Sequence, residues 1–237
     1  MSKKFTVTID GVNVPAKEDQ TIMQVADAAG IYIPRLCWHK DLFPGGNCRV
    51  CTVRMNGRPV SACTYPVAEN QLIENDTKEL MELRRRLVEL HFIEGNHCCP
   101  SCELSGNCEL QATGYRVGMI APTLPYLYPE NTVDATHKEV YIDRDRCILC
   151  GRCIRASRDL DKKNVFGLVG RGIHTKITVN SDSTLCGTNM KASDKAACIC
   201  PTGALVVKGK GFSIPVGKRK YDFEPIGSDV EKKRKSG

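Results

Sequence analysis

Aromatic residues and long apolar stretches are scarce in this sequence. Only 6% of the 237 residues are aromatic, and a surface that binds nucleic acid needs aromatic side chains among its basic ones, so we expect no nucleic-acid partner. No segment approaches the roughly eighteen consecutive apolar residues of a membrane-spanning helix, which predicts no membrane insertion. The opening residues, MSKKFTVTID, contain no apolar stretch of signal-peptide length. These absences predict a cytoplasmic protein.

Motifs for the common catalytic centres are missing as well. No G-x-G-x-x-G follows a predicted strand, and no Walker-type phosphate loop occurs. Paired Cys-x-x-Cys motifs that would suit a nickel–iron centre are also missing. We therefore predict that the chain has no reactive site of its own.

Positive charge is concentrated near the C-terminal end. The net charge is +7, and the residues from Lys208 onward, with nine Lys or Arg and four Asp or Glu, contribute +5 of it. The rest of the chain is close to neutral. Residues 211–237 are predicted to form a basic tail that is flexible or used in docking.

Cysteine, in contrast, is abundant, with fourteen residues in the chain. Cytosolic thiols stay reduced, so this number indicates metal ligation rather than a disulfide framework. Zinc sites and iron–sulfur clusters are the two kinds of site to compare.

Local patterns predict both strands and helices. FTVTIDGVNV alternates around Asp10-Gly11 and predicts a hairpin, and Thr21 with Gln24 forms a capping box that begins a helix ending at Gly30. A second helix is predicted over 77–94, with Asp76 and Glu79 as its capping box and four leucines on one face: Leu80, Leu83, Leu87 and Leu90.

The second half of the chain contains a linker and further strand patterns. Residues 121–132 hold three prolines and predict a linker. Beyond it, EVYID, HTKITVN and ALVVK are typical of strands.

The first set of candidate ligands is spaced by ten, two and eleven residues: Cys37, Cys48, Cys51 and Cys63. The Cys-x-x-Cys pair brings two thiolates to one metal, and the nearby glycines let backbone N–H groups approach the sulfurs. Plant-type [2Fe–2S] proteins have about four residues in the first gap, so this set departs from their pattern. A four-cysteine zinc site is the alternative, although such sites usually draw on two Cys-x-x-Cys pairs.

The last set contains Cys147, Cys150 and Cys153, two residues apart, and the remote pair Cys200-Pro201. Bacterial ferredoxins use C-x₂-C-x₂-C-x₃-C-P, whose fourth cysteine binds the other cluster of a pair. Ser157 stands at that fourth position here, so we predict one [4Fe–4S] cluster bound by the triplet and Cys200, with zinc as the alternative. Two cysteines are left over and are interpreted as small buried side chains: Cys186 and Cys198.

The middle run, NHCCPSCELSGNCEL at 96–110, resembles the CP-x-C-x₅-C pattern of the large iron–sulfur subunit of respiratory complex I. With an upstream histidine, that pattern marks a His-Cys₃ [4Fe–4S] site. The resemblance implies four ligands: His97, Cys99, Cys102 and Cys108. The family usually has three residues between the histidine and the first cysteine, and only Cys98 lies between them here. Cys98, which would give an all-thiolate site, and His91 of the preceding helix therefore remain alternatives.

The three sets in this order resemble the electron-transfer module at the N-terminus of that complex I subunit and of iron-only hydrogenases. The resemblance implies an α+β fold in three parts, followed by the basic tail: an N-terminal β-grasp [2Fe–2S] ferredoxin-like domain at 1–77, a small helical His-Cys₃ [4Fe–4S] lobe at 78–120 and a bacterial-ferredoxin-like [4Fe–4S] lobe at 133–210.

The short length after this module most resembles the iron–sulfur diaphorase subunit of NAD-reducing [NiFe] hydrogenases. That family implies a non-catalytic subunit that passes single electrons between a hydrogenase heterodimer and a flavin- and NAD-binding diaphorase subunit. The equivalent subunit of an NAD-linked formate dehydrogenase, or of another assembly like complex I, is the first alternative. A multi-zinc scaffold that binds nucleic acid through the basic tail is the second.

Overall fold

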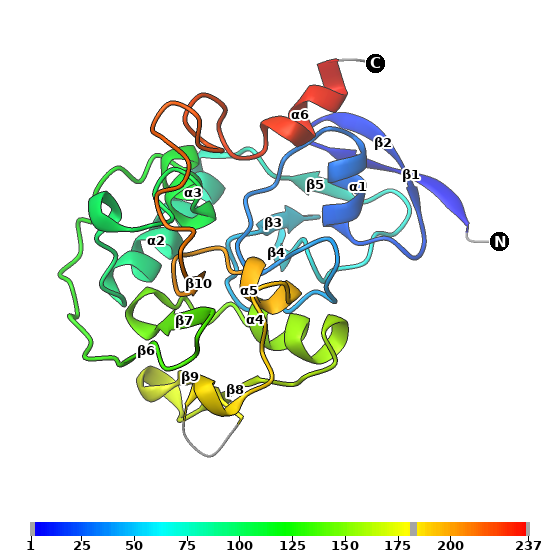
Figure 1. Cartoon of the computed structure of the whole chain (residues 1–237). Helices are drawn as coiled ribbons and strands as arrows, with labels where there is room; N and C mark the ends of the chain where they lie inside the picture. The colour runs from blue at the N-terminus through cyan, green and yellow to red at the C-terminus, as the bar shows by residue number, and fades with distance from the viewer. Residues whose placement is uncertain (1–2, 181–183, 236–237) are drawn as a thin grey trace.

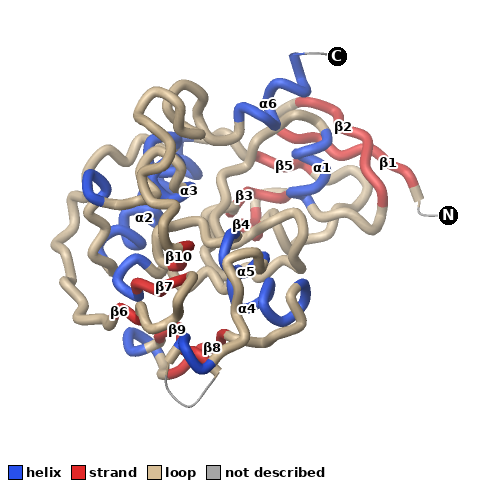
Figure 2. The backbone as a smooth tube through the Cα atoms, viewed as in Figure 1, coloured by secondary structure: helices blue, strands red, loops and turns tan. Residues whose placement is uncertain are grey.

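The computed structural model describes residues 3–180 and 184–235 (Figure 1). Long loops connect short helices and strands through most of the chain (Figure 2). This mixture of helices and strands agrees with the predicted α+β class.

Five strands in the N-terminal part form one mixed sheet in the order β2-β1-β5-β3-β4. Strand β1 is parallel to β5, and the other pairs are antiparallel. With one helix packed on the sheet, this order is the one expected of a β-grasp domain. The elements are β1 (Lys4–Ile9), β2 (Val12–Lys17), α1 (Ile22–Ala28), β3 (Thr52–Met55), β4 (Arg58–Ser61) and β5 (Leu72–Glu74).

Local sequence signals produce the hairpin and the first helix as predicted. Asp10 and Gly11 have φ values of 49° and 77°, as a two-residue turn between antiparallel strands requires. Thr21 and Gln24 form the reciprocal hydrogen bonds of a capping box, and Gly30, with a φ of 70°, follows the end of α1. Apolar side chains of the sheet and of α1 then share one core, which includes Val7, Ile9, Val14, Ile22, Val25, Val53 and Ile73.

Helix α2 (Lys78–Ile93) forms where it is predicted, but its cap and its buried face differ from the prediction. The N-cap is Thr77, whose hydroxyl accepts a hydrogen bond from the Leu80 amide at 3.2 Å, and not Asp76. Leu83 and Leu90 are each 40% exposed. Two charged residues are buried instead because distant segments supply their hydrogen-bond partners. The buried residues of α2 are Leu80, Arg84, Val88, Glu89, Phe92 and Ile93.

A one-turn helix at Cys99–Ser101 and helix α3 (Glu109–Arg116) follow α2. Residues 121–132 contain no helix or strand, as predicted for a linker. Glu89 of α2 holds the start of this linker, because its carboxylate accepts hydrogen bonds from the backbone amides of Thr123 and Leu124 and from the Thr123 hydroxyl.

The next part has a three-stranded antiparallel sheet in the order β10-β7-β6 and a separate β8-β9 hairpin. The three strand patterns found in the sequence correspond to β7, β9 and β10. The elements are β6 (Val133–Asp134), β7 (Val140–Asp143), α4 (Arg152–Arg155), which continues into a π-helical turn at Ala156–Leu160, β8 (Phe166–Val169), β9 (Lys176–Val179), α5 (Lys195–Cys198) and β10 (Leu205–Val207), with one-turn helices at Arg144–Arg146, Gly172–His174 and Leu185–Gly187.

The basic tail returns to the body of the molecule and is not a free extension over its described residues. It ends in α6 (Ser228–Lys235), which lies beside α1 at the top of Figure 1. Ile226 and Val230 are buried against Tyr32 and Ala112, and Glu231 forms an ion pair with Arg116. Of the two predicted alternatives, a flexible tail or a docking tail, the described residues show a docked one, although the apolar residues that make the contact gave no separate signal among the charges.

A shared apolar cluster lies where the three parts of the chain meet. It combines residues next to all three sets of candidate ligands: Leu36, Cys37, Cys48, Val50, Val88, Phe92, Cys108, Leu110, Val117, Met119, Ile148 and Cys150. The three sets are therefore packed around one common interior.

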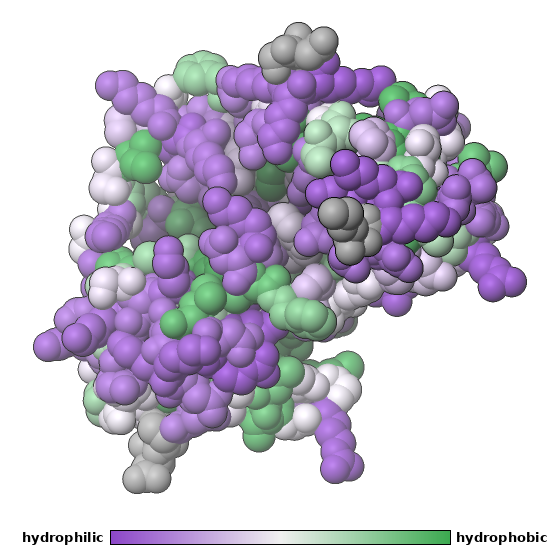
Figure 3. Space-filling view, turned by 90° about the vertical axis from the view of Figure 1, so that its right-hand side faces the viewer, coloured by the Kyte–Doolittle hydropathy of each residue, from purple (hydrophilic) through white to green (hydrophobic). Residues whose placement is uncertain are grey.

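Hydrophilic side chains cover most of the face in Figure 3, and small hydrophobic patches interrupt them. Among the described residues, no helix combines the length and the apolar character needed to cross a membrane.

Candidate functional site

The first set of cysteines is brought together from the long loop before β3 and from the turn after β4. Cys37, Cys48, Cys51 and Cys63 are 1%, 7%, 1% and 0% exposed. The backbone N–H of Cys37 donates a hydrogen bond to the Cys48 sulfur at 3.4 Å, which is the kind of main-chain contact expected near a cluster ligand. All four predicted ligands of this set therefore lie in one buried group.

Mutual hydrogen bonding sets the acidity of these thiols. A hydrogen bond with Cys48 lowers the pKa of Cys37 to about 2, and a hydrogen bond with Cys63 lowers the pKa of Cys51. Hydrogen bonds with Cys37 raise the pKa of both Cys48 and Cys63. The four sulfurs cannot all ionise without a compensating positive charge, so their donor chemistry suits a metal that displaces the remaining protons.

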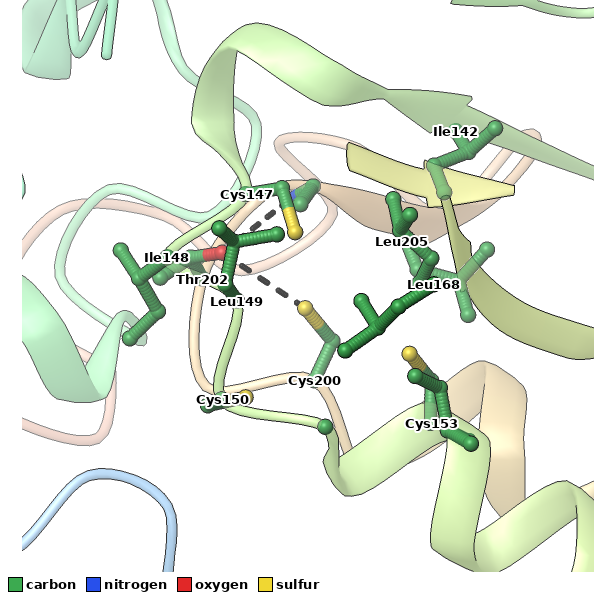
Figure 4. Close-up of a pocket in the computed structure, with 14 residues that line it drawn as sticks. Ile142, Cys147, Ile148, Leu149, Cys150, Cys153, Leu168, Cys200, Thr202 and Leu205 are labelled. Atoms are coloured by element: carbon green, nitrogen blue, oxygen red, sulfur yellow. Dashed lines mark hydrogen bonds between the residues drawn. The ribbon is translucent and has the colours of Figure 1, made fainter. Parts of the chain in front are cut away.

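The last set surrounds a cavity between α4, the β10-β7 sheet and the loop that precedes α4 (Figure 4). Cys147, Cys150, Cys153 and Cys200 all line it, and the rest of its wall is largely apolar, with Ile142, Ile148, Leu168, Ile177 and Leu205 among the lining residues. Thr202 lies 3.6 Å from the Cys200 sulfur, a hydrogen bond drawn in Figure 4. The structure thus brings the remote Cys200 to the triplet, as the sequence predicted.

Burial dominates the acidity of this last set. It raises the pKa of Cys147 to about 11 and that of Cys150 to about 12, and it also raises the pKa of Cys153 well above its usual value. Ser157, which stands at the position of a fourth ferredoxin cysteine, is 1% exposed, and its hydroxyl accepts a hydrogen bond from the Val165 amide at 2.8 Å. Ser157 therefore holds the backbone and does not face the cavity.

The middle set lines a second cavity, between α2, the one-turn helix and the start of α3. His97, Cys98, Cys99, Cys102 and Cys108 all contribute to its wall, together with Arg146 and Gly203 from the C-terminal part. Burial raises the pKa of Cys108 to about 12 and also raises the pKa of Cys99. The cavity therefore contains one more candidate ligand than a cluster needs.

The environments of His97, Cys98 and His91 differ. The Nε2 atom of His97 is buried without a hydrogen-bond partner in the described chain, and burial lowers the pKa of this imidazole to about 4, so it is neutral at pH 7. Cys98 is an exposed residue. His91 also has a buried Nε2 without a partner among the described residues, but it lines a different cavity, beside Cys48 and Cys147. A buried, neutral and unpartnered imidazole nitrogen in the cavity wall favours His97.

Two glycines keep space beside the middle set. A Cβ added to Gly203 would lie 2.8 Å from the Cys102 sulfur, and one added to Gly95 would lie 2.8 Å from His97 Nε2. Real Cβ atoms do not approach other atoms so closely, so both positions require glycine if the two ligands keep their places. The residues present therefore fit a bound cluster.

Arginines beside the ligands are functional candidates that sequence reasoning missed. Arg146 donates to the Cys102 sulfur at 3.7 Å and pairs with Glu103 at 2.8 Å. Arg155 donates to the carbonyl oxygens of Cys37 and Cys150 at 2.7 and 3.2 Å. The run CILCGRCIR does show arginines between and after the proposed ligands. The sequence alone does not show which groups these arginines bind.

The three sets do not form single-ion sites. Over residues 3–180 and 184–235, no three His, Cys, Asp or Glu side chains converge in a way that would hold one metal ion. The middle and last sets line cavities instead.

The two leftover cysteines are not buried, so the interpretation of them as small core residues is wrong. Cys186 and Cys198 are both exposed. The Cys186 sulfur lies 3.1 Å from the Thr184 hydroxyl, and Cys198 ends helix α5. The apolar residues next to them in the sequence, Leu185, Ala197 and Ile199, are buried in the core, but the two cysteines are not.

Comparison with known proteins agrees with this division into sites. Three family models match in succession: the 2Fe-2S iron-sulfur cluster binding domain at 2–78, the NADH-ubiquinone oxidoreductase-G iron-sulfur binding region at 84–122, and the NADH-quinone oxidoreductase subunit 3 ferredoxin-like domain at 138–206. The gamma subunit of the NAD-reducing hydrogenase HoxS of Cupriavidus necator is 39% identical over 221 residues, which are 93% of this chain and 94% of that protein. The chain belongs to this family of gamma subunits.

A solved structure of the same kind supports the family membership. A chain in the crystal structure of an NAD⁺-reducing [NiFe]-hydrogenase in the H₂-reduced state matches with a TM-score of 0.93 and 42% identity, covering 97% of this chain and 98% of that chain.

More distant relatives are much longer proteins. The mitochondrial NADH-ubiquinone oxidoreductase 78 kDa subunit of Candida albicans is 30% identical over 87% of this chain. The alpha subunit of the NADPH-Fe(3+) oxidoreductase of Geobacter sulfurreducens is 31% identical over 86% of it. The matched segments are 29% and 24% of those proteins. The predicted domain boundaries, at 1–77, 78–120 and 133–210, stay a prediction.

Proposed function

We propose that this chain is the iron–sulfur subunit of an NAD-reducing [NiFe] hydrogenase. In this role it passes single electrons between a hydrogenase module and a flavin- and NAD-binding diaphorase subunit, for the reaction H₂ + NAD⁺ = NADH + H⁺. The likeness to the gamma subunit, which extends over 93% of this chain and 94% of the relative, carries the proposal.

The proposed ligands form three stations. A [2Fe–2S] cluster would be held by Cys37, Cys48, Cys51 and Cys63, a His-Cys₃ [4Fe–4S] cluster by His97, Cys99, Cys102 and Cys108, and a Cys₄ [4Fe–4S] cluster by Cys147, Cys150, Cys153 and Cys200. Such clusters, when bound, accept and release one electron at a time. The burial of the first set and the largely apolar wall around the last set support this assignment.

The chain's own residues supply the environment of each station. Backbone N–H groups and Arg146 donate toward sulfur, and this stabilises the more negative, reduced form of a site. The neutral His97 imidazole replaces one thiolate charge, so we expect the middle station to be reduced more easily than an all-thiolate site.

The segment from Cys200 to Gly203 lies between the last and middle stations. Cys200 lines one cavity and Gly203 the other, and the Cys108 sulfur lies 3.5 Å from the Pro201 carbonyl oxygen between them. This short connection supports a direct route for electrons between the two.

The composition of the purified complex tests the proposal. We expect the complex, isolated anaerobically from its own cells through an affinity tag on this chain, to contain at least ten iron atoms per copy of the chain, two from the [2Fe–2S] and eight from the two [4Fe–4S] clusters, in addition to the iron of its partners. It should be isolated together with nickel and flavin and should reduce NAD⁺ with H₂. Zinc in place of iron would refute the clusters. Iron in the expected amount, with molybdenum or tungsten and formate oxidation in place of nickel, would instead indicate the formate dehydrogenase alternative.

A further inference from the structure

A partly buried ion pair connects the three stations. Arg152 is 2% exposed, and its two terminal nitrogens bind the two carboxylate oxygens of Glu109 at 2.7 and 3.0 Å. Arg152 lies between Cys150 and Cys153 of the last station, and Glu109 directly follows Cys108 of the middle station. The pair therefore links the ligand-bearing segments of two stations.

The Arg152 guanidinium also donates hydrogen bonds to backbone carbonyl groups next to other proposed ligands. It donates to the carbonyl oxygen of Trp38 at 2.7 Å and to that of Ile199 at 3.5 Å. Trp38 follows Cys37 of the first station, and Ile199 precedes Cys200 of the last. One side chain thus contacts a residue adjacent to a proposed ligand of every station.

We propose that Arg152 and Glu109 are positioning residues that fix the three stations relative to one another and balance their potentials. The inference rests on the proposed function, because it needs clusters at all three sets. Arginine suits this role because its planar guanidinium donates hydrogen bonds in fixed directions, here to one carboxylate and two carbonyl groups. A lysine ammonium is a single point charge and cannot do this.

The opposite charges of Arg152 and Glu109 predict the direction of each change in reduction potential. A cation near a cluster favours its reduced, more negative form, and an anion disfavours it. Replacing Arg152 by a neutral residue leaves the Glu109 carboxylate uncompensated beside Cys108, so reduction of the middle station becomes harder. Replacing Glu109 by glutamine leaves the cation uncompensated, so reduction becomes easier. Loss of packing alone does not predict opposite shifts.

Redox titration of the intact complex, followed by electron paramagnetic resonance, tests this inference. We expect Arg152→Gln to lower the reduction equilibrium constant of the middle station at least tenfold, which is 59 mV for one electron, and Glu109→Gln to raise it. Arg152→Lys keeps the charge but not the fork. It should shift the equilibrium less than Arg152→Gln does, while changing the magnetic interaction between reduced stations.

Arg84→Gln is the matched control. Arg84 is 1% exposed, and it donates to the carbonyl oxygens of Asn75 and Thr52, all near the first station. This variant should leave the middle station unchanged.

Two results would overturn the inference. Shifts of the same sign in Arg152→Gln and Glu109→Gln would contradict the charge balance. If the Arg152→Gln complex does not assemble, Glu109→Gln and Arg152→Lys test the inference in its place. An unchanged potential of the middle station, together with unchanged magnetic interactions in both variants, would refute the positioning role. A wild-type complex with fewer than three cluster signals would instead refute the proposed function.

Discussion

The first and middle sets of ligands differ in how they are covered. The ligands of the first set all come from one domain, and none of these cysteines is more than 7% exposed. In the middle set Cys99 and Cys102 are partly exposed, and residues from the C-terminal part, Arg146 and Gly203, complete the wall. The first site is thus the more deeply buried of the two, whereas the middle site needs side chains of another part of the chain to close its wall.

The largest expected effect is the loss of one station. Cys63→Ala removes a fully buried ligand, and the remaining three thiols of the first set cannot complete a four-ligand site. We expect the iron content to fall by about two atoms and the [2Fe–2S] resonance to disappear. Because the other two sets do not share Cys63, both [4Fe–4S] signals should persist. Their loss in this variant would show that the first set is not independent.

The choice of ligand in the middle set is the second test. His97→Ala should abolish or alter the resonance of the middle station, because its unpartnered Nε2 is the proposed iron ligand. Cys98→Ala, one residue away on an exposed position, is the control and should leave the spectrum unchanged. His97→Cys should restore a cluster with a lower potential, since a thiolate adds a negative charge. The reverse outcome for alanine at 97 and 98 would assign Cys98 instead.

The dependence of the middle site on its neighbours predicts a smaller effect. Gly203→Ala places a Cβ 2.8 Å from the Cys102 sulfur, so either the sulfur or the Cys200–Gly203 segment must move. We expect the middle cluster to bleach several-fold faster in air while the first stays unaffected, as measured by absorbance and resonance. Gly114→Ala is the control, since the nearest atoms to its added Cβ lie at 3.4 Å. Equal bleaching of both variants would argue against the contact with Gly203.

Local sequence signals predicted more of the first domain than of the middle one. The Asp10-Gly11 turn and the Thr21 capping box need only neighbouring residues, and both form as predicted. The buried face of α2 was predicted from its leucines, but Arg84 and Glu89 take that face because carbonyl and amide groups of distant segments satisfy them. Such partners have no signal within the helix.

The ligand sets were likewise predicted where the signal is local and missed where it depends on distant segments. Spacing alone grouped Cys147, Cys150 and Cys153, and the Cys-Pro motif placed Cys200 with them. The roles of Arg152 and of Gly203 were missed, because each depends on a segment more than forty positions away. Exposure of Cys186 and Cys198 was missed for a related reason, since a cysteine that binds nothing has no pattern of its own.

The smallest expected effect is the loss of stability when the polar contacts of Glu89 are removed. Glu89→Gln removes a buried carboxylate that accepts from Thr123, Leu124 and Arg86, so we expect a loss of about 1–3 kcal/mol. That loss corresponds to a fall of about 2–12 °C in the midpoint of thermal unfolding for a domain of this size. Glu82→Gln, on the exposed side of the same helix, should change stability by less than about 0.5 kcal/mol.

The effect of Glu89 should also depend on pH in a known direction. Burial opposes ionisation of this carboxyl, but hydrogen bonds from Thr123 and Leu124 outweigh it and hold the pKa of Glu89 at about 2, below its usual value of 4.5. A carboxylate with a lowered pKa contributes its stability above the unfolded value and loses it as the pH falls toward the folded value. The difference in thermal midpoint between wild type and Glu89→Gln should therefore be constant above about pH 4.5 and shrink below it. If the difference in thermal midpoint instead grows on acidification, Glu89 is protonated in the folded protein. The linker would then be held to α2 by hydrogen bonds to a neutral carboxyl group.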